Sequence, residues 1–426
     1  MDKLLKSIDK IIVIFSLLYY TGTLNFLGGI TDASNPALTE TESVSGGILS
    51  MIQILLHILT LLMTCARYKQ IIYVASKRKF LWGFVAVISL SFLWSAVPDF
   101  TLRRTFIFIS TILLALNISV RYTVREQLFL FTWAMGFLVA INIVFALTFP
   151  SAAIESGQFQ GAWRGVYVQK NVLGSRAVLS ATVFLLATLE SRNHKFIVYL
   201  GLGFSFLLVL LCGSKGSLIV FLVLVSLFPL FWALRSNNWL VLPLLIVGIL
   251  VGGSIIIFLI ENQAVIVEFL GRDLTLTGRT GIWSVVISKI SNHPWLGYGY
   301  RSFWRGREGE SIDVWYETFF LAPNAHNGFL DLLVELGIIG LSCFILSYIK
   351  SFIRAITWLR LNSTAVGLFP VIYLMYILFY NLAESTILEP APFVLLLYTS
   401  ITTSMLTQPI LIASSNLSTT THTSGA

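Results

Sequence analysis

The chain has 426 residues, of which 28 are Lys or Arg and 20 are Asp or Glu, so charged residues make up only 11% of it. Soluble domains contain about 25% charged residues. With 56% of its residues hydrophobic, the chain cannot be an ordinary soluble protein. Its net charge of +8 is spread over short tracts between apolar segments, which argues against a nucleic-acid-binding patch.

Apolar segments long enough to cross a bilayer recur along the whole chain. The first follows MDKLLK without a small-residue cleavage site and predicts a retained helix. The three cysteines lie in apolar runs and predict neither a disulfide nor a metal pair. The sequence predicts an all-α integral membrane protein with twelve transmembrane helices, near residues 11–30, 47–66, 80–97, 105–120, 127–148, 172–189, 196–212, 218–234, 239–260, 327–349, 365–382 and 391–407.

Lys and Arg in the short connections predict the orientation. With the N-terminus inside, sixteen of them lie in cytoplasmic connections and six in outer ones, so both termini are expected in the cytoplasm. The chain then divides into helices one to nine, a large outer loop between helices nine and ten, helices ten to twelve and a mobile Ser/Thr-rich tail, at residues 1–260, 261–326, 327–407 and 408–426.

The outer loop 261–326 is the candidate functional domain, because long connections usually carry function. Within it, Trp283, Val286 and Ile290 recur at three- and four-residue spacing and predict an amphipathic helix over 280–291. The HPWLGYGY sequence at 293–300 predicts a turn rich in glycine and aromatic residues at the membrane interface.

The end of this loop carries the most specific pattern in the chain. His326 and Asn327 are followed after nine residues by Gly337 and, two residues later, by Gly340. The spacing predicts an imidazole at the outer end of a helix whose glycines let a neighbouring helix approach closely. Imidazoles titrate near neutrality and can take a proton from a hydroxyl. Alternatively, His326 could simply cap the helix with Asn327 as its partner.

This HNx9GxxG arrangement resembles the signature of the bacterial O-antigen ligase and polymerase superfamily, membrane enzymes that transfer glycans from a polyprenyl-diphosphate carrier. Three further segments resemble the same family: WSAVPDFTLRR with Arg103 and Arg104, RGVYVQKNVLG with Lys170, and GRTGIW with Arg279. The sequence departs from the family at Lys215, where many relatives have arginine. Lysine keeps the charge but lacks the bidentate fork, which puts a direct phosphate role at this position in doubt.

Seven basic residues fall on the predicted outer side, against the usual charge bias. A diphosphate at the membrane surface would explain them, because guanidiniums bind phosphate oxygens through paired hydrogen bonds. Anchoring to anionic headgroups or pairing with nearby carboxylates is the alternative for each. The predicted diphosphate-binding residues are Arg279, followed by Arg164 and Arg176, and then Lys170, Lys215, Arg103 and Arg104.

Glu384, in NLAESTILEP at the outer end of the eleventh helix, is the second predicted catalytic residue. It could orient His326 or hold an acceptor hydroxyl, or it could face water as an ordinary loop carboxylate. The outer loops lack HxxxH, DxD and DxDxDG patterns, and the chain lacks Walker and Rossmann motifs. The sequence therefore predicts no metal site and no cofactor.

The resemblance implies a multi-pass protein of the bacterial inner membrane that polymerises polyprenyl-diphosphate-linked oligosaccharide repeats on the periplasmic side. Donor and acceptor would both be lipid-linked, and membrane lipid and a chain-length regulator are further expected partners. The implied reaction is a metal-independent, inverting displacement. In it, Arg279 and either Arg164 or Arg176 hold the leaving diphosphate while His326 deprotonates the acceptor.

Three alternatives compete with this prediction. An O-antigen ligase would transfer the glycan to the lipid A core, although the segment around Lys170 favours a polymerase. A polysaccharide transporter or flippase fits the helix count but predicts broken helices in matched halves and charges within the membrane. A structural membrane scaffold would leave His326 and the outer arginines without a purpose.

Overall fold

The computed structural model describes residues 2–28, 47–191, 195–235, 279–362 and 364–407. The predicted ninth span at 239–260, the first part of the outer loop at 261–278 and the predicted tail at 408–426 lie outside the described residues. Within the described ranges every regular element is a helix, which confirms the predicted all-α class.

The helices follow one another with short connections. The α-helices are α1 (Asp2–Tyr20), α3 (Gly47–Ala66), α4 (Tyr68–Ser76), α5 (Lys79–Leu90), α6 (Pro98–Arg121), α7 (Val124–Thr148), α8 (Pro150–Ala153), α9 (Lys170–Glu190), α10 (Lys195–Leu211), α11 (Lys215–Arg235), α14 (Arg279–Asn292), α15 (Ile312–Thr318), α16 (Gly328–Leu361), α17 (Leu368–Ala383) and a last helix, Phe393–Thr407. Short 3-10 turns lie at Asn25–Gly28, Ser91–Leu93, Gly157–Phe159, Gly306–Glu308 and Ala365–Gly367.

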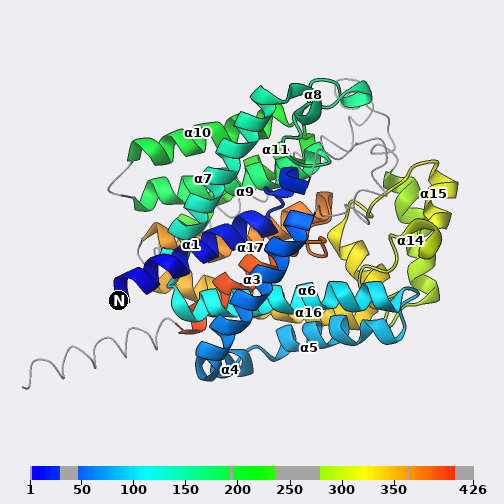
Figure 1. Ribbon diagram of the computed structural model, residues 1–426, viewed down its shortest axis with the longest axis horizontal. Coiled ribbons are helices and arrows are strands. Elements are labelled where there is room, and N and C mark those ends of the chain that lie inside the picture. Colours follow the sequence, from blue (N-terminus) through cyan, green and yellow to red (C-terminus); the bar gives the residue numbers. More distant parts are fainter. Residues whose placement is uncertain (1, 29–46, 192–194, 236–278, 363, 408–426) are drawn as a thin grey trace, which may run out of the picture.

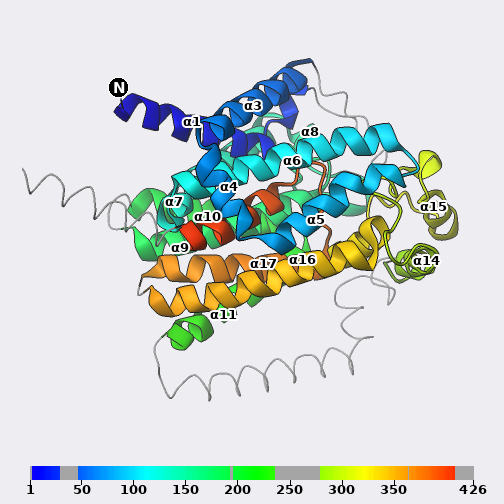
Figure 2. The ribbon, with the colours of Figure 1, turned by 90° about the horizontal axis from the view of Figure 1, so that it is seen from below.

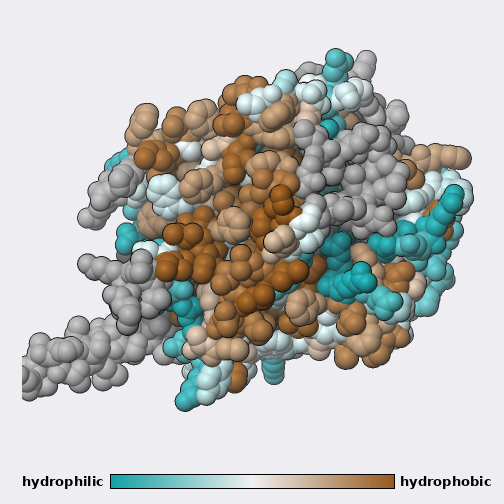
Figure 3. All heavy atoms as spheres, in the orientation of Figure 1, coloured by the Kyte–Doolittle hydropathy of each residue, from teal (hydrophilic) through white to brown (hydrophobic). Residues whose placement is uncertain are grey.

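Seven of the described helices are long and apolar enough to cross a membrane, and three shorter apolar helices accompany them. These helices coincide with ten of the predicted spans, and α1 corresponds to the first predicted span. Apolar side chains cover the middle of the face in Figure 3, whereas hydrophilic ones gather at the end that carries α14 and α15. The chain is therefore a multi-pass membrane protein with an apolar, lipid-facing belt.

Two predicted spans have different bounds in the structure. α1 ends at Tyr20 rather than near residue 30, because Gly22 adopts φ +77° and the hydroxyls of Thr21 and Thr23 bond each other at 2.7 Å. α16 has 34 residues and continues to Leu361. At about 1.5 Å per residue it is roughly 50 Å long, whereas the apolar core of a bilayer is about 30 Å thick. Part of α16 must therefore extend beyond the apolar core.

The helices form a bundle whose centre is shielded from lipid (Figures 1 and 2). The spanning helices differ in how much of their most apolar stretch is buried inside the protein. The buried share is 83% in the α17 span and 78% in α9, but only 17% in α3. α9 packs against α7, α10 and α11, and α16 packs against α5 and α17. The central helices α9 and α17 thus provide the scaffold, and α3 contacts mainly lipid.

The described part of the outer loop forms a small unit beside the bundle, with α14 and α15 at one end of Figure 1. The amphipathic helix predicted over 280–291 is confirmed as α14. Val286 is fully buried, and Trp283 and Ile290 pack against the same apolar cluster, which includes Val334 of α16. This cluster fixes α14 against the beginning of α16.

α16 is broken at Gly337, whose backbone has φ +64° and ψ −170°. The segment 294–299 enters this break. The N–H of Ile338 donates to the Pro294 carbonyl at 2.8 Å, and the N–H groups of Tyr298 and Gly299 donate to carbonyls of α16 at 2.9 and 2.8 Å. The prediction that the motif glycines receive a neighbouring helix is therefore wrong for Gly337. Gly337 receives a loop, because only a break in the helix frees backbone groups for the loop to bond.

Replacing Gly337 with Ala should destabilise the protein by roughly 1 to 3 kcal/mol or more, because a side chain is strained at positive φ. A Cβ at this position would also lie 2.3 Å from the carbonyl group of Trp295. The melting temperature of the detergent-solubilised variant measures the effect. Gly203→Ala in α10 is the control, since its Cβ would meet no atom within 4 Å. Equal melting temperatures for both variants would contradict the strain argument.

Candidate active site

The site is built around Glu384, which directly follows α17. Asn381, fully buried in the last turn of α17, determines the path of the chain there. Its side-chain oxygen accepts the N–H groups of Thr386 and Ile387 at 2.9 and 3.1 Å, and its amide donates to the Thr386 hydroxyl at 2.9 Å. This turn points the Glu384 side chain towards the beginning of α9, α14 and α16.

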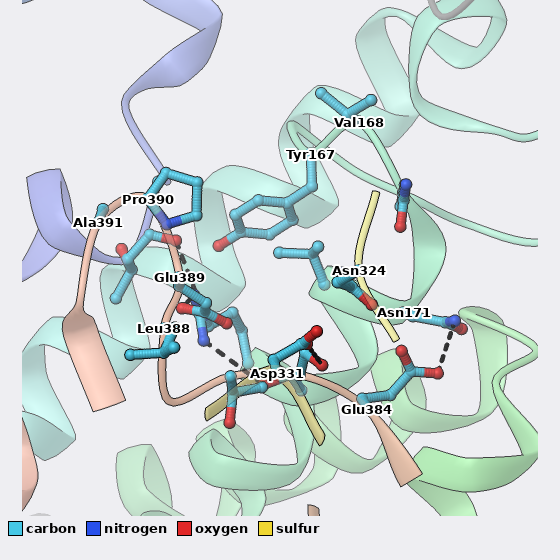
Figure 4. Close-up of a pocket in the computed structure, with 18 of the residues that line it drawn as sticks. Tyr167, Val168, Asn171, Asn324, Asp331, Glu384, Leu388, Glu389, Pro390 and Ala391 are labelled. Carbon is cyan, nitrogen blue, oxygen red and sulfur yellow. Dashed lines mark hydrogen bonds and ion pairs between the residues drawn. The ribbon is translucent and has the colours of Figure 1, made fainter. Parts of the chain in front are cut away.

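Three residues from distant parts of the sequence donate hydrogen bonds to the Glu384 carboxylate. His326 Nδ1 lies 2.8 Å from Oε2, and Arg279 Nη2 lies 2.7 Å from Oε1. Asn171 Nδ2 lies 2.9 Å from the same Oε1 (Figure 4). The structure thus brings together three of the residues singled out from the sequence, His326, Glu384 and Arg279. The alternative that Glu384 faces water is excluded, because its side chain is only 12% exposed.

The Glu384 carboxylate determines which nitrogen of the His326 ring carries the hydrogen that faces it. Burial alone raises the pKa of this carboxyl, but the hydrogen bond and charge of His326 and the charge of Arg279 outweigh burial and lower the pKa. An ionised carboxylate can only accept hydrogen bonds, so it takes the N–H of His326 Nδ1. Nε2 is then the ring nitrogen that can accept a proton, the arrangement required of a general base.

The backbone around His326 is held by polar contacts that begin in the preceding turn. His326 has φ +48°, and its N–H donates to the side-chain oxygen of Asn324 at 2.9 Å. Asp331 accepts the N–H of Ala325 at 3.1 Å. Asn327 is the N-cap of α16 through its own side chain, which accepts two backbone N–H groups. The histidine is therefore not the helix cap, and its ring is left for Glu384.

A cavity of about 210 Å³ adjoins this cluster, and Glu384, Asn171 and Asn324 form part of its wall (Figure 4). Its other residues come from α1, α6, α9, α16, the segment after α17 and the turn that contains Arg301. Three arginines line the cavity: Arg104, Arg176 and Arg301. Four carboxylates also line it: Asp331, Glu335, Glu384 and Glu389. Such a mixed polar wall at the end of the bundle suits a charged, hydroxyl-rich ligand.

The predicted diphosphate-binding residues separate into two groups. Arg176 lines the cavity and is ion-paired with Glu389 at 2.6 Å, Arg104 also lines it, and Arg279 contacts Glu384. The other four are not among the described residues of the cavity wall. Arg164 donates to two loop carbonyls, Lys170 lies over the Phe159 ring at 3.8 Å, Lys215 begins α11, and Arg103 is exposed on α6.

Among the described residues there is no group of three or more His, Cys, Asp and Glu side chains arranged to hold a metal ion. Charged side chains in the cavity wall and beside it instead pair with one another. Arg176 with Glu389 and Arg279 with Glu384 are both partly or fully buried, which requires such pairing.

Comparison with known proteins points to a family. Residues 200–345 match the O-antigen ligase family. Over 286 residues the chain is 27% identical to the exopolysaccharide production protein ExoQ of Rhizobium meliloti, a match that covers 64% of each protein. Over these residues the chain resembles the O-antigen ligase and polymerase superfamily.

Proteins described as polysaccharide ligases are further members that resemble this chain. The protein of Rickettsia felis is 26% identical over 259 residues, which are 58% of this chain and 61% of that protein. The protein of Rickettsia conorii is 35% identical over 97 residues, which are 21% of this chain and 24% of that protein. The matched regions span less than two thirds of ExoQ and of the Rickettsia felis protein.

Several residues of the site are not among those predicted from the sequence. Arg301 donates its N–H to Glu335 at 2.8 Å and its guanidinium to the Leu388 carbonyl at 3.2 Å, so it ties the outer loop to the segment after α17. Glu389 was within the quoted NLAESTILEP sequence and Asp331 within the HNx9GxxG motif. Their proximity to these motifs was the available signal, but only packing reveals which carboxylates face the cavity.

Replacing Glu384 with Gln should destabilise this membrane protein by roughly 1 to 3 kcal/mol at pH 7, because it leaves the partly buried Arg279 charge without its carboxylate partner. The folded-state pKa of Glu384 lies below the ordinary value of 4.5. Its stabilising effect is therefore fully present above pH 4.5 and lost as the pH falls through the folded-state value. The difference in melting temperature between wild type and variant should narrow as the pH falls below 4.5.

The matched control is Glu190→Gln. Glu190 also accepts from an arginine, Arg125, at 2.8 Å, but that arginine side chain is 60% exposed. Because Arg125 keeps its contact with water, the loss of its carboxylate partner costs at most about 1 kcal/mol. A Glu384→Gln protein as stable as this control at pH 7 would show that Arg279 does not depend on Glu384.

Proposed function

We propose that the protein is a membrane glycosyltransferase that polymerises polyprenyl-diphosphate-linked oligosaccharide repeats. The observation that carries this proposal is the hydrogen bond between His326 and the Glu384 carboxylate, beside a cavity lined by arginines. It combines a proton acceptor with cations that suit a diphosphate leaving group, which are the two requirements of glycan transfer from such a donor.

In the proposed reaction, His326 Nε2 takes the proton of an acceptor hydroxyl as its oxygen attacks the anomeric carbon of the donor sugar. The bond between that carbon and the diphosphate oxygen breaks, and the diphosphate leaves with the electron pair. Glu384 stabilises the imidazolium that forms, as a buried carboxylate does beside a catalytic histidine. Attack opposite the leaving group inverts the configuration at the anomeric carbon.

The cations that would hold the diphosphate are Arg176 and Arg104 in the cavity wall, with Arg279 beside Glu384 and Arg301 from the outer loop. Arg164, which the sequence had offered as the alternative to Arg176, is less suited because its guanidinium donates to the carbonyls of Ala152 and Val168. No metal ion is required in this mechanism, because the guanidiniums compensate the charge of the leaving group.

The match to ExoQ, described as an exopolysaccharide production protein, supports a role in making a polysaccharide, and polymerisation of repeats is the form of that role that we propose. The ligase alternative is favoured by the description of the matching family as O-antigen ligase. A purified enzyme supplied with one lipid-linked oligosaccharide distinguishes the two activities. A polymerase forms a ladder of longer lipid-linked products, whereas a ligase requires added lipid A core as acceptor.

We further propose that the cavity end of the bundle faces the periplasm of a bacterial inner membrane and that both termini are cytoplasmic. In a variant lacking its three native cysteines, Ser288→Cys on the exposed side of α14 should react with an impermeant thiol reagent added to cells. Ser76→Cys, exposed at the end of α4, should react only after the membrane is opened. The reverse labelling pattern would invert the proposed orientation.

His326→Ala should reduce the rate of transfer roughly 100- to 10,000-fold, the usual contribution of a general base. The product ladder from the lipid-linked oligosaccharide gives the rate. Folding should be retained because α16 is capped by Asn327 rather than by His326. His293→Ala is the control, since His293 is exposed and packs on Tyr298 away from Glu384. Near-normal transfer by His326→Ala would exclude it as the base.

A further inference from the structure

A second cavity, of about 150 Å³, lies where α4 meets α5 and the C-terminal half of α16 passes beside them. It is at the opposite end of the bundle from Glu384. α5 ends near the first cavity, where the Ser91 hydroxyl accepts the N–H of Tyr300 at 3.0 Å, so the first residues of α5 lie at the other end. α16 likewise begins beside His326 and runs away from it (Figure 2).

The lining of this second cavity is strongly basic. Five of its residues are cations, and no Asp or Glu is among the described residues of its wall. The cations are Lys77, Arg78, Lys79, Lys350 and Arg354. The first cavity has arginines as well, but there carboxylates compensate them. The second cavity therefore concentrates positive charge without a carboxylate from its described wall to balance it.

Arg78 distinguishes this cluster from ordinary basic anchors at a membrane surface. It is only 5% exposed, and its Nη1 reaches the Ser351 hydroxyl at 3.4 Å. Its Nη2 is buried and has no hydrogen-bond partner among the described residues. An unsatisfied buried donor costs about 1 to 3 kcal/mol, and more when it is charged. The exposed Lys77 and Lys79, by contrast, can reach water or headgroups directly.

The surroundings of Arg78 destabilise the charged form of its guanidinium. Burial lowers the pKa of this guanidinium, and repulsion from Arg354 lowers it further. Because an arginine stays protonated in proteins, the lowered pKa means that the charged form is destabilised where it stands. Tyr398 offsets part of this effect through its hydroxyl and its ring, whose centroid lies 5.7 Å away, but that hydroxyl is also bonded to Ser347 and Ser351. A bound anion would offset both burial and repulsion.

We propose that this cavity is a binding site for a phosphate group. Arg78 is its buried anchor, Lys350 and Arg354 contact the phosphate from α16, and the Ser351 hydroxyl lies beside Arg78. A phosphate offers several acceptor oxygens, and a guanidinium fork matches two of them. The group is carried either by an anionic lipid headgroup or by a phosphate-bearing solute. The site is independent of glycan transfer at the other end of the bundle.

The test uses the full-length protein in phosphatidylcholine nanodiscs. In one arm, the phosphatidylglycerol content is raised; in the other, inorganic phosphate is titrated at constant ionic strength. The melting temperature reports binding, because a ligand that binds the folded state raises it. Stabilisation by phosphatidylglycerol alone assigns the site to a lipid headgroup, and stabilisation by inorganic phosphate assigns it to a solute. Stabilisation in neither arm overturns the proposal.

The double variant Lys350→Gln, Arg354→Gln should bind about a hundredfold more weakly, roughly tenfold for each cation removed from the phosphate. Lys350 is exposed and Arg354 is half-buried, so the variant keeps the buried Arg78 in place and removes only its repulsion by Arg354. Arg360→Gln is the control, because it removes an exposed cation from the same helix outside the cavity. Equal weakening of binding in the control and the double variant would show a general charge effect and overturn the site.

Discussion

The rest of the site depends on the hydrogen bonds and the ion pair that the Glu384 carboxylate makes. It joins the beginnings of α9, α14 and α16 through Asn171, Arg279 and His326. Each of these contacts spans between 58 and 213 positions in the sequence, and all of them meet at one side chain. A carboxylate can accept several hydrogen bonds and balance a positive charge at once, and no neutral side chain combines both properties. The site therefore forms only when the helices are packed.

The break in α16 positions further residues at the end of the bundle that holds this site. A continuous helix would have no free backbone groups at Gly337, whereas the broken one accepts and donates hydrogen bonds along 294–299. The loop then carries Arg301 to the cavity and Glu335 receives its N–H. A single glycine with positive φ thus couples a transmembrane helix to the outer loop, and through it to the proposed diphosphate-binding arginines.

The two ends of the bundle differ in whether their buried cations have carboxylate partners. Around the first cavity, Arg176 and Arg279 have the carboxylates of Glu389 and Glu384 as partners. A substrate diphosphate there would compete with existing pairs, so that its binding and release can be balanced. Around the second cavity, Arg78 has no such carboxylate among the described side chains, and the charge favours an anion that stays bound.

The sequence by itself determined the helical class, most of the spans, and the catalytic candidates His326, Glu384 and Arg279. Hydropathy and local motifs are properties of consecutive residues, and they survive whatever the chain packs against. Only the tertiary structure decided that Gly337 breaks its helix, that Arg164 serves a loop, and that Arg301 and Glu389 face the cavity. These outcomes depend on which distant side chains meet, and hydrogen bonding and charge pairing between packed helices are not encoded in any local pattern.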